Sequence, residues 1–520
     1  MVKFLNDNNI ITSSQSGFTA GDSTIYQLLN IYDDLLNALD NNIPSQAIFF
    51  DISKAFDRVW HQGLLHKLHA VGIRGSLLAW FKNYLTDRTQ AVVVKGAKSN
   101  FLTVRAGVPQ GSILGPILFL LYINDLNDGI VSTTKLFADD TSMYLSQNDE
   151  PTRSTMLNLD LEKINTWAIK WKVNFNCQKT ELLNICRRND TINNRLIFDN
   201  SLLQPRPFHK HLGLTLQGNC KWDSHVTNLV AKCQTLVACL KSYKYRFSRK
   251  SLEIMYKSYV LPHFDYADSV WDNLTQAQVE SLEQIQLDAL RTIIGTVRGT
   301  SHDKIYRESG FVPLKIRRDR HKLILFFKFV NGLLPNHISC KFPQLVVDLN
   351  PYHRRRPLER KVPRWNTELY HNSFFPTATA LWNQLPDTIK KLTSISAFKR
   401  NLSSDDPVVP PYLYSGDRLP QIIHCKLRLN MSDLRSDMFN RHISEDKYCN
   451  CGFPNETADH YLLNCPLYHE TRLNTLSILP PIAQNCNVLL FGNAGFSLAF
   501  NEYIILTVHE FIMLSGRFEN

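Results

Sequence analysis

The sequence lacks three features that would place the protein in a membrane or outside the cell. No apolar run reaches the roughly 18 residues that a membrane-spanning helix needs. The first ten residues lack the apolar core of a signal peptide. The 11 cysteines are scattered and do not form the compact framework of a small secreted protein. These absences argue against a membrane protein and predict an intracellular protein with reduced thiols.

Charged residues are also modest in number, at 20% of the chain, whereas hydrophobic residues make up 44%. This balance indicates a globular rather than a disordered protein. A length of 520 residues predicts more than one domain, roughly two to four. The formal net charge of +11 suits a polyanionic partner, although a basic balance alone is weak evidence.

The stretch that best indicates chemistry is residues 135–144, KLFADDTSMY. An apolar run precedes Asp139 and Asp140, and a β-prone run follows them, which predicts a hairpin with both acids at its turn. Adjacent carboxylates repel each other, and Mg²⁺ would offset that repulsion. An ordinary acidic β-turn is the alternative, because Asp is a common turn residue.

A second carboxylate ends another apolar run. Residues 47–50 predict a strand that delivers Asp51 at its end, where it could alternatively be a simple cap or turn residue. By default, Phe56 would be a core aromatic residue. Helices are expected next at 62–72 and 75–86, followed by an antiparallel pair formed by 88–94 and 101–104.

Residues 107–116, GVPQGSILGP, form a glycine- and proline-rich segment. Glycine lets backbone approach a ligand closely. Ser112 is expected to cap a helix at 113–125, whose free N–H groups could face an anion or a base. The alternative is a plain turn before a buried helix.

Helical periodicity appears in several further segments. Between Lys241 and Trp271, basic residues are interleaved with aromatic ones, which suits either a nucleic-acid groove or a solvated helical face. Pro-rich segments at 343–366, which includes the basic run Arg354–Arg356, and at 403–420 are expected to be linkers. The expected helices cover residues 23–40 (capped by Ser23 or Thr24), 153–172, 225–295, 311–334 and 499–514.

The C-terminal region contains four residues of the types that Zn²⁺ prefers, in the spacing C-x-C-x8-H-x4-C. They are Cys449, Cys451, His460 and Cys465. Four such ligands in a short span predict a tetrahedral zinc site. A C-x-C pair is tighter than the usual spacing, so a buried cysteine pair beside a chance histidine is the alternative.

These motifs occur in a fixed order, and together they resemble the reverse transcriptase of LINE-type, non-LTR retrotransposons of the jockey-like sort. The QSGF segment, the Tyr/Trp-rich segment 256–271 and the cysteine–histidine tail also look like parts of that family. The strings that carry the resemblance are AIFFDISKAFDRVWH, GVPQGSILGPILF, KLFADDTSMY, NCQKTELL and HLGLTL.

The resemblance implies an α+β fold of the right-hand polymerase type. Its palm is an antiparallel sheet backed by helices, with partial fingers, a helical thumb and a small C-terminal zinc-knuckle-like domain. The expected boundaries are 1–46 (partial fingers), 47–220 (palm with fingers insertions), 221–300 (thumb), 301–402 (basic helical connector) and 403–520 (C-terminal domain).

The resemblance also implies RNA-directed DNA polymerase activity. In that reaction a DNA 3′-hydroxyl attacks the α-phosphate of a dNTP on an RNA template, with two Mg²⁺ ions stabilising the attacking and leaving oxygens. By resemblance Asp51 and Asp139 bind these ions, with Asp140 beside them. The partners are therefore an RNA template, a DNA primer or target, and dNTPs, in the nucleus and cytoplasm.

Further site residues follow from the same resemblance. The Ile52 carbonyl is a further metal ligand, Phe56 the gate against a ribose 2′-hydroxyl, and Lys179 a basic residue for the leaving pyrophosphate. The remaining matches are Gln110 and Gly111 for the nucleotide and template pocket, Ala138 for the floor under the primer terminus, and Leu212 and Gly213 for the primer grip.

The family normally carries more fingers strands before QSGF and an endonuclease domain further upstream, so the sequence is expected to be N-terminally truncated. Two other classes of function stay open: an inactive remnant that only binds nucleic acid, and an interaction protein built on an inactive palm. A maturase-type intron polymerase is an alternative of the same class, against which the C-terminal tail argues.

Overall fold

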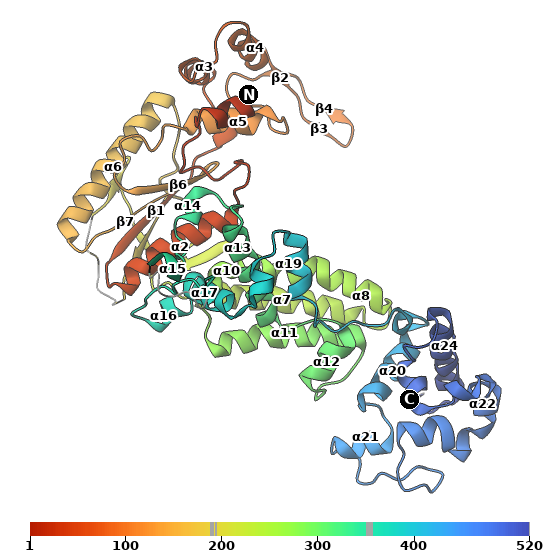
Figure 1. Cartoon of the computed structure of the whole chain (residues 1–520). Helices are drawn as coiled ribbons and strands as arrows, with labels where there is room; N and C mark the ends of the chain where they lie inside the picture. Colours follow the sequence, from red (N-terminus) through yellow and green to blue (C-terminus); the bar gives the residue numbers. More distant parts are fainter. Residues whose placement is uncertain (188–191, 193–194, 350–356, 519–520) are drawn as a thin grey trace. The chain divides into compact units, whose positions relative to one another are not determined.

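The computed structural model describes residues 1–187, 192, 195–349 and 357–518 (Figure 1). The chain divides into two compact units, each assembled from separate stretches of sequence. The first comprises Met1–His225, Ser269–Leu274 and His321–Ile395. The second comprises Val226–Asp268, Thr275–Arg320 and Ser396–Asn520.

A five-stranded sheet forms the centre of the first unit, in the order β11-β8-β1-β7-β6. Strand β1 (Ser45–Phe50) is central and fully buried, and it pairs antiparallel with both β7 (Asp140–Ser146) and β8 (Glu181–Ile185). The outer strands are β6 (Thr133–Phe137), antiparallel to β7, and β11 (Pro205–Arg206), parallel to β8. The sheet is thus mostly antiparallel.

Helices cover both faces of this sheet (Figure 1). Helix α6 (Glu150–Trp171) packs Leu157, Leu161 and Ile164 against a core that includes Ile48 and Phe50 of β1. Helix α2 (Thr24–Asp40) contacts β1 and β6, and the Ser23 hydroxyl caps it by accepting a hydrogen bond from the Tyr26 amide. Successive side chains of β1 point to opposite faces of the sheet, and all six of its residues are buried, so both faces are covered.

A helical subdomain follows β1. The predicted helices appear as α3 (His61–Ala70) and α4 (Gly75–Leu85). The expected pairing of 88–94 with 101–104 is confirmed at β2 (Thr89–Gln90) and β5 (Leu102–Thr103), but the tip folds back on itself as β3 (Val93–Val94) and β4 (Ala97–Lys98). The apolar side chains of this hairpin are exposed, so packing does not extend its strands.

The rest of the first unit consists of short elements around the sheet. They are α1 (Val2–Asp7), η1 (Ala55–Arg58), α5 (Leu114–Ile123), β9 (Ile197–Phe198), β10 (Ser201–Leu202), β12 (Phe208–His211), β13 (Leu214–Gln217), α14 (Asn336–Ser339), α15 (Val346–Leu349), α16 (Glu368–His371), α17 (Phe374–Gln384) and α18 (Asp387–Lys390). Part of the predicted 343–366 linker, with Arg354–Arg356, lies outside the described residues.

The second unit is helical. The prediction of helices over 225–295 is confirmed. Two of the aromatic residues that alternate with basic residues in this segment, however, cannot line a nucleic-acid groove. Tyr256 and, in the first unit, Trp271 are fully buried. The Tyr256 ring packs edge to face on Phe311 and its hydroxyl donates to Gln286, and the Trp271 ring contacts His225. The elements are α7 (Asp223–Ser242), α8 (Arg249–Met255), η2 (Tyr256–Val260), α9 (Leu261–Asp265), α11 (Gln276–Ile294) and α12 (His302–Ser309). Helix α10 (Asp268–Trp271) belongs mostly to the first unit, and α13 (Leu314–Val330) begins in the second unit and ends in the first.

The prediction of a linker at 403–420 is wrong for the second half of that segment. Tyr412 and Leu413 are buried against Ile505 of α24, and the Tyr414 hydroxyl bonds to Glu253. These apolar contacts outweigh the turn-forming tendency of the neighbouring prolines. The elements here are α19 (Ile395–Leu402), η3 (Pro411–Tyr414), α20 (Arg418–Leu429), α21 (Arg435–Asn440), η4 (His460–Asn464), η5 (Pro466–Tyr468), α22 (His469–Asn474), η6 (Leu476–Ile478), η7 (Pro481–Ala483), α23 (Cys486–Phe491) and α24 (Leu498–Leu514).

The protein therefore has a mixed α+β fold built on an antiparallel-rich sheet, as predicted. In the part of the chain that the structure describes, every helix is too short or too polar to cross a bilayer.

Candidate active site and metal centre

Three carboxylates lie near one another at one end of the central strands of the sheet. In the β1–β7 ladder Phe50 pairs with Thr141, so the next positions along the two strands bring Asp51 beside Asp140. Phe137 pairs with Asp140, which leaves Ala138 and Asp139 as the two-residue turn between β6 and β7. The predicted hairpin is therefore present, with Asp139 in its turn.

The three acids interact electrostatically. The pKa of the Asp140 carboxyl is raised above its ordinary value, first because neighbouring atoms shield it partly from water. The negative charges of Asp139 and Asp51 raise it further. A cluster of hard oxygen donors whose charges repel one another is a donor set that suits Mg²⁺.

Backbone pairing brings Lys179 to the same place. The Asn176 amide donates to the Asp51 carbonyl at 2.8 Å, and the Ser53 amide donates to the Asn174 carbonyl at 2.9 Å. Ile52 lies between these bonds, buried and paired with Phe175. The Lys179 Nζ then lies 3.9 Å from Asp51 Oδ2 and is otherwise exposed.

Phe56 lies in η1, one turn beyond Asp51, and is half-buried between two other aromatic rings. It stacks on Phe119 of α5 with ring centroids 4.4 Å apart, and the ring of Phe18 meets it edge to face at 6.4 Å. These contacts fix the plane of the Phe56 ring.

The glycine-rich segment 107–116 contacts Asp57 in η1, which follows β1. Gln110 Nε2 donates to Asp57 Oδ1 at 2.8 Å. A Cβ at Gly107 would lie 2.7 Å from the Asp57 carbonyl oxygen, so this contact requires glycine. Gly111 faces open space, and Ser112 Oγ caps the start of α5 by accepting from the Gly115 amide at 2.9 Å.

A residue outside the hairpin, Gln15, contacts the turn that carries Asp139. Ala138 is buried and has a left-handed φ of 54°. Its amide donates to Gln15 Oε1 at 3.0 Å.

Leu212 and Gly213 form the two-residue turn between β12 and β13, with φ values of 43° and 89°. Left-handed backbone at both positions is typical of a tight hairpin turn, which explains the glycine. His209 of β12 stacks on Phe49 of β1 at 3.9 Å and contacts Glu181 of β8 at 2.7 Å. The hairpin is thus attached to β1, which ends before Asp51, and to β8, which begins after Lys179.

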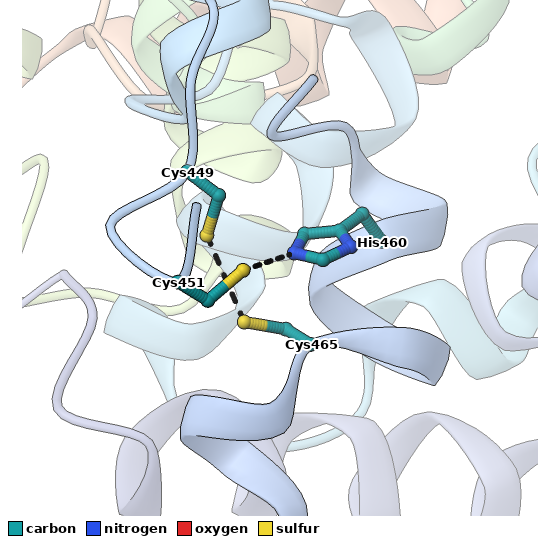
Figure 2. A group of neighbouring side chains, drawn as sticks. All are labelled: Cys449, Cys451, His460 and Cys465. Atoms are coloured by element: carbon teal, nitrogen blue, oxygen red, sulfur yellow. Dashed lines mark hydrogen bonds between the residues drawn. The ribbon is translucent and has the colours of Figure 1, made fainter. Parts of the chain in front are cut away.

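The second unit contains the predicted cysteine–histidine cluster (Figure 2). Its four donor atoms all lie within 4.8 Å of one another. Cys449 Sγ lies 3.7 Å from Cys465 Sγ, and Cys451 Sγ lies 3.2 Å from His460 Nε2. Zn–S bonds of about 2.3 Å in a tetrahedron place two sulfurs about 3.8 Å apart, so the cysteine pair has a spacing that suits zinc.

The surroundings of this cluster hold its geometry. Phe453 stacks on the His460 ring at 4.3 Å, and the Cys449 amide donates to the Phe453 carbonyl at 2.9 Å. The Cys465 carbonyl accepts from Arg472 at 2.8 Å. Of the two interpretations of the motif, the gathered donor set favours a metal-binding cluster.

Residues 1–216 match the family described as reverse transcriptase (RNA-dependent DNA polymerase). The chain contains a reverse transcriptase domain. All of the carboxylates and pocket residues described in the first unit, from Gln15 to Gly213, lie within it.

The reverse transcriptase domain has relatives in insect mobile elements. The chain is 28% identical over 383 residues to the probable RNA-directed DNA polymerase from transposon X-element of Drosophila melanogaster, covering 68% of this chain and 41% of that protein. It is 29% identical over 299 residues to the RNA-directed DNA polymerase from mobile element jockey of the same species, covering 55% and 32%. The predicted jockey-like, non-LTR relationship is confirmed, and the chain spans less than half the length of these relatives.

Among solved structures, telomerase from Candida albicans in complex with a fragment of telomeric RNA is 14% identical, with a TM-score of 0.34 over 55% of each chain. Apo telomerase from Candida tropicalis is 13% identical, with a TM-score of 0.35 over 65% of this chain and 54% of the other. TM-scores of this size do not establish a shared overall fold.

Two contacts of the reverse transcriptase domain were not predicted from the sequence. Asp57 was not singled out, although it bonds to Gln110, and the contact of Gln15 with Ala138 spans 123 residues. Neither has a local sequence signal, because a hydrogen bond between distant segments leaves no periodicity.

Proposed function

We propose that this chain is an RNA-directed DNA polymerase of a non-LTR retrotransposon, which extends a DNA 3′-end with dNTPs on an RNA template. The observation that supports this most strongly is that the strand pairing places Asp51, Asp139 and Asp140 near one another at one end of the sheet, with Lys179 beside Asp51. The family match over residues 1–216 gives this cluster its chemical context.

In this proposal Asp51 and Asp139 hold two Mg²⁺ ions, with Asp140 beside them and the Ile52 carbonyl as a further ligand. Bound Mg²⁺ supplies the positive charge that stabilises the attacking and leaving oxygens of an in-line displacement. The carboxylates orient that charge, and the pKa of the Asp140 carboxyl, which burial and its acidic neighbours raise, would fall when a cation binds.

Lys179 lies 3.9 Å from Asp51, where its ammonium group can neutralise or protonate the leaving pyrophosphate. Its exposed side chain is free to turn toward a bound triphosphate. Ala138, buried within the turn, forms the floor for the primer terminus. Leu212 and Gly213 act as the primer grip on the adjacent hairpin.

Phe56 excludes ribonucleotides by filling the space that a 2′-hydroxyl would need. Its packing on Phe119 supports that role, because a side chain that moved aside would admit ribonucleotides as well as deoxyribonucleotides. Gln110 and Gly111 line the nucleotide and template pocket. Gly111 has a φ of 81° and open space at its Cβ position, so a base or sugar can approach its backbone closely.

We assign residues 1–46 to partial fingers, 47–220 to the palm and 221–300 to the thumb, followed by a connector at 301–402 and a C-terminal domain at 403–520. Tyr245 and Tyr259 are each 65% exposed beside lysines of the proposed thumb. Aromatic faces next to lysines can hold a template–primer duplex by stacking and by phosphate contacts.

The cysteine–histidine cluster is proposed to bind one structural Zn²⁺ in a zinc-knuckle-like arrangement. All four positions are occupied by protein donors, as in structural zinc sites, which keep no open position for a substrate.

The proposal is tested by Asp139→Asn. This substitution removes one negative charge from the turn and keeps its shape. It should abolish DNA synthesis while leaving the affinity for an RNA–DNA duplex unchanged. Equal loss of both properties would contradict a metal-binding role for Asp139. A wild-type protein that binds the duplex and never extends it would support the inactive remnant instead.

A further inference from the structure

Residues 14–18, whose sequence is Ser-Gln-Ser-Gly-Phe, run beside the turn that carries Asp139. The Ser16 amide donates to the Leu136 carbonyl at 2.9 Å, and the Leu136 amide donates to the Ser14 carbonyl at 2.9 Å. Gln15 pairs with Leu136 as an isolated parallel bridge on the free edge of β6. This N-terminal segment therefore extends the central sheet next to the candidate active site.

The side chain of Gln15 turns inward from this edge and is only 4% exposed. Its Oε1 accepts from two backbone amides, those of Gly17 at 2.8 Å and Ala138 at 3.0 Å. The second bond reaches the residue immediately before Asp139. A buried amide left without an acceptor would cost roughly 1–3 kcal/mol, so this bond favours the observed turn over alternatives.

The turn needs such support because Ala138 has a left-handed φ of 54°. A residue with a Cβ is disfavoured there, by about 1–2 kcal/mol. Glycine would adopt this conformation freely, but Ala138 adopts it only if its surroundings impose it. Gln15 provides a partner that is specific for this backbone orientation.

Gly17 makes the close approach possible. A Cβ at this position would lie 2.4 Å from the Ala138 nitrogen and 2.8 Å from the Phe137 carbonyl carbon. Both are backbone atoms, so neither can move aside without displacing the turn. The segment thus contacts the turn through main chain on one side and through Gln15 on the other.

We propose that Gln15 is a positioning residue, which fixes the Ala138 amide and thereby the direction in which Asp139 presents its carboxylate. This inference rests on the proposed polymerase function and extends it to a segment far from the acids in sequence. Gln15 touches neither substrate nor metal in this account. It acts only through the backbone of the turn.

The test compares Gln15→Met, which keeps the length of the side chain but removes the acceptor, with Gln15→Glu, which keeps an accepting oxygen. Gln62→Met, at an exposed position of α3, is the matched control. Primer extension at saturating Mg²⁺ should show kcat reduced about tenfold or more in Gln15→Met with duplex affinity unchanged, because small displacements of reacting groups are costly. Gln15→Glu should retain more of the wild-type kcat than Gln15→Met, because it keeps an accepting oxygen, and Gln62→Met should match the wild type.

A second measurement does not depend on catalysis. Hydrogen exchange at the Ala138 amide, resolved by fragmentation of peptides from residues 135–144, should be faster in Gln15→Met than in the wild type, Gln15→Glu and Gln62→Met. Unchanged exchange in Gln15→Met, or equal kcat in Gln15→Met and the wild type, would overturn the inference. The wild type could fail to extend primers while the Ala138 amide still exchanges faster in Gln15→Met than in the other proteins. In that case the polymerase proposal fails, but the role of Gln15 in fixing the turn is supported.

Discussion

Asp57 and Gln110, 53 residues apart, are joined by a hydrogen bond of 2.8 Å between Oδ1 and Nε2. Asp57 lies in η1, directly after Phe56, and Gln110 lies in the glycine-rich segment before α5. The bond therefore connects the proposed ribose gate to the proposed nucleotide pocket. Neither residue contributes to the hydrophobic core, so the bond affects the shape of the pocket more than overall stability.

Asp57→Ala should raise the KM for dNTPs roughly three- to tenfold with little change in thermal stability, because an exposed hydrogen bond contributes about 0.5–1.5 kcal/mol. Steady-state primer extension at varied dTTP measures this effect. The double variant Asp57→Ala/Gln110→Ala should be no worse than Gln110→Ala alone. Strictly additive losses would show that the two residues act separately, and Asp7→Ala, at an exposed position of α1, is the control.

Phe56→Val should relax discrimination against ribonucleotides. The smaller side chain leaves space beside Phe119 and Phe18 where a 2′-hydroxyl can fit. We expect the ratio of kcat/KM for dTTP over UTP to fall by about tenfold or more. Phe4→Val, at an exposed position of α1, is the control. An unchanged ratio would assign the gate to another residue.

Lys67 links three helices in the core of the first unit. Its Nζ bonds to Asp125 Oδ1 and the Tyr122 carbonyl, both at 2.5 Å, and lies 3.9 Å from the centre of the Trp171 ring. Burial lowers the pKa of Lys67 to about 8, although the hydrogen bond and charge of Asp125 oppose that shift. The charge of Lys170 also lowers this pKa, and the charge of Asp128 raises it.

Because the folded protein holds this proton less tightly than the unfolded chain, the free energy of unfolding should rise with pH above about 8, up to the ordinary lysine pKa near 10.5. The slope from this one group is at most about 1.4 kcal/mol per pH unit. Lys67→Met should lack this contribution. Urea unfolding followed by tryptophan fluorescence at pH 7 to 10 tests it; parallel pH profiles for variant and wild type would contradict the assignment.

Purified protein should contain about one zinc ion per chain, bound by the cysteine–histidine cluster. Cys449→Ala should lose that zinc, because three remaining donors cannot complete a closed tetrahedral site. Cys239→Ala, at an exposed position of α7, should keep it. Elemental analysis after dialysis against a weak chelator measures both. Zinc-free wild-type protein with an ordered C-terminal domain would refute the site.

Local patterns in the sequence predicted several elements well. The periodicity of α2 with its Ser23 cap, the strand that ends at Asp51 and the hairpin around Asp139 all depend on residues close in sequence. The spacing of the four cysteine and histidine residues likewise predicted their clustering.

Contacts between distant segments could not be predicted in this way. Helical periodicity in 225–295 does not say which aromatic residues face a core, and Tyr256 is buried while Tyr259 is exposed. The hydrogen bonds of Asp57 and Gln15 depend on how the sheet brings separate loops together. A proline-rich composition likewise suggested a linker where burial of Tyr412 and Leu413 orders the chain.

The most direct test of the central claim is primer extension on poly(rA)·oligo(dT) by the purified protein with Mg²⁺ and dTTP, beside an Asp51→Ala control. The account predicts extension by the wild type and none by Asp51→Ala, with both proteins binding the duplex equally. No extension by a folded wild-type protein that still binds the duplex would contradict the polymerase assignment and leave a protein that only holds nucleic acid.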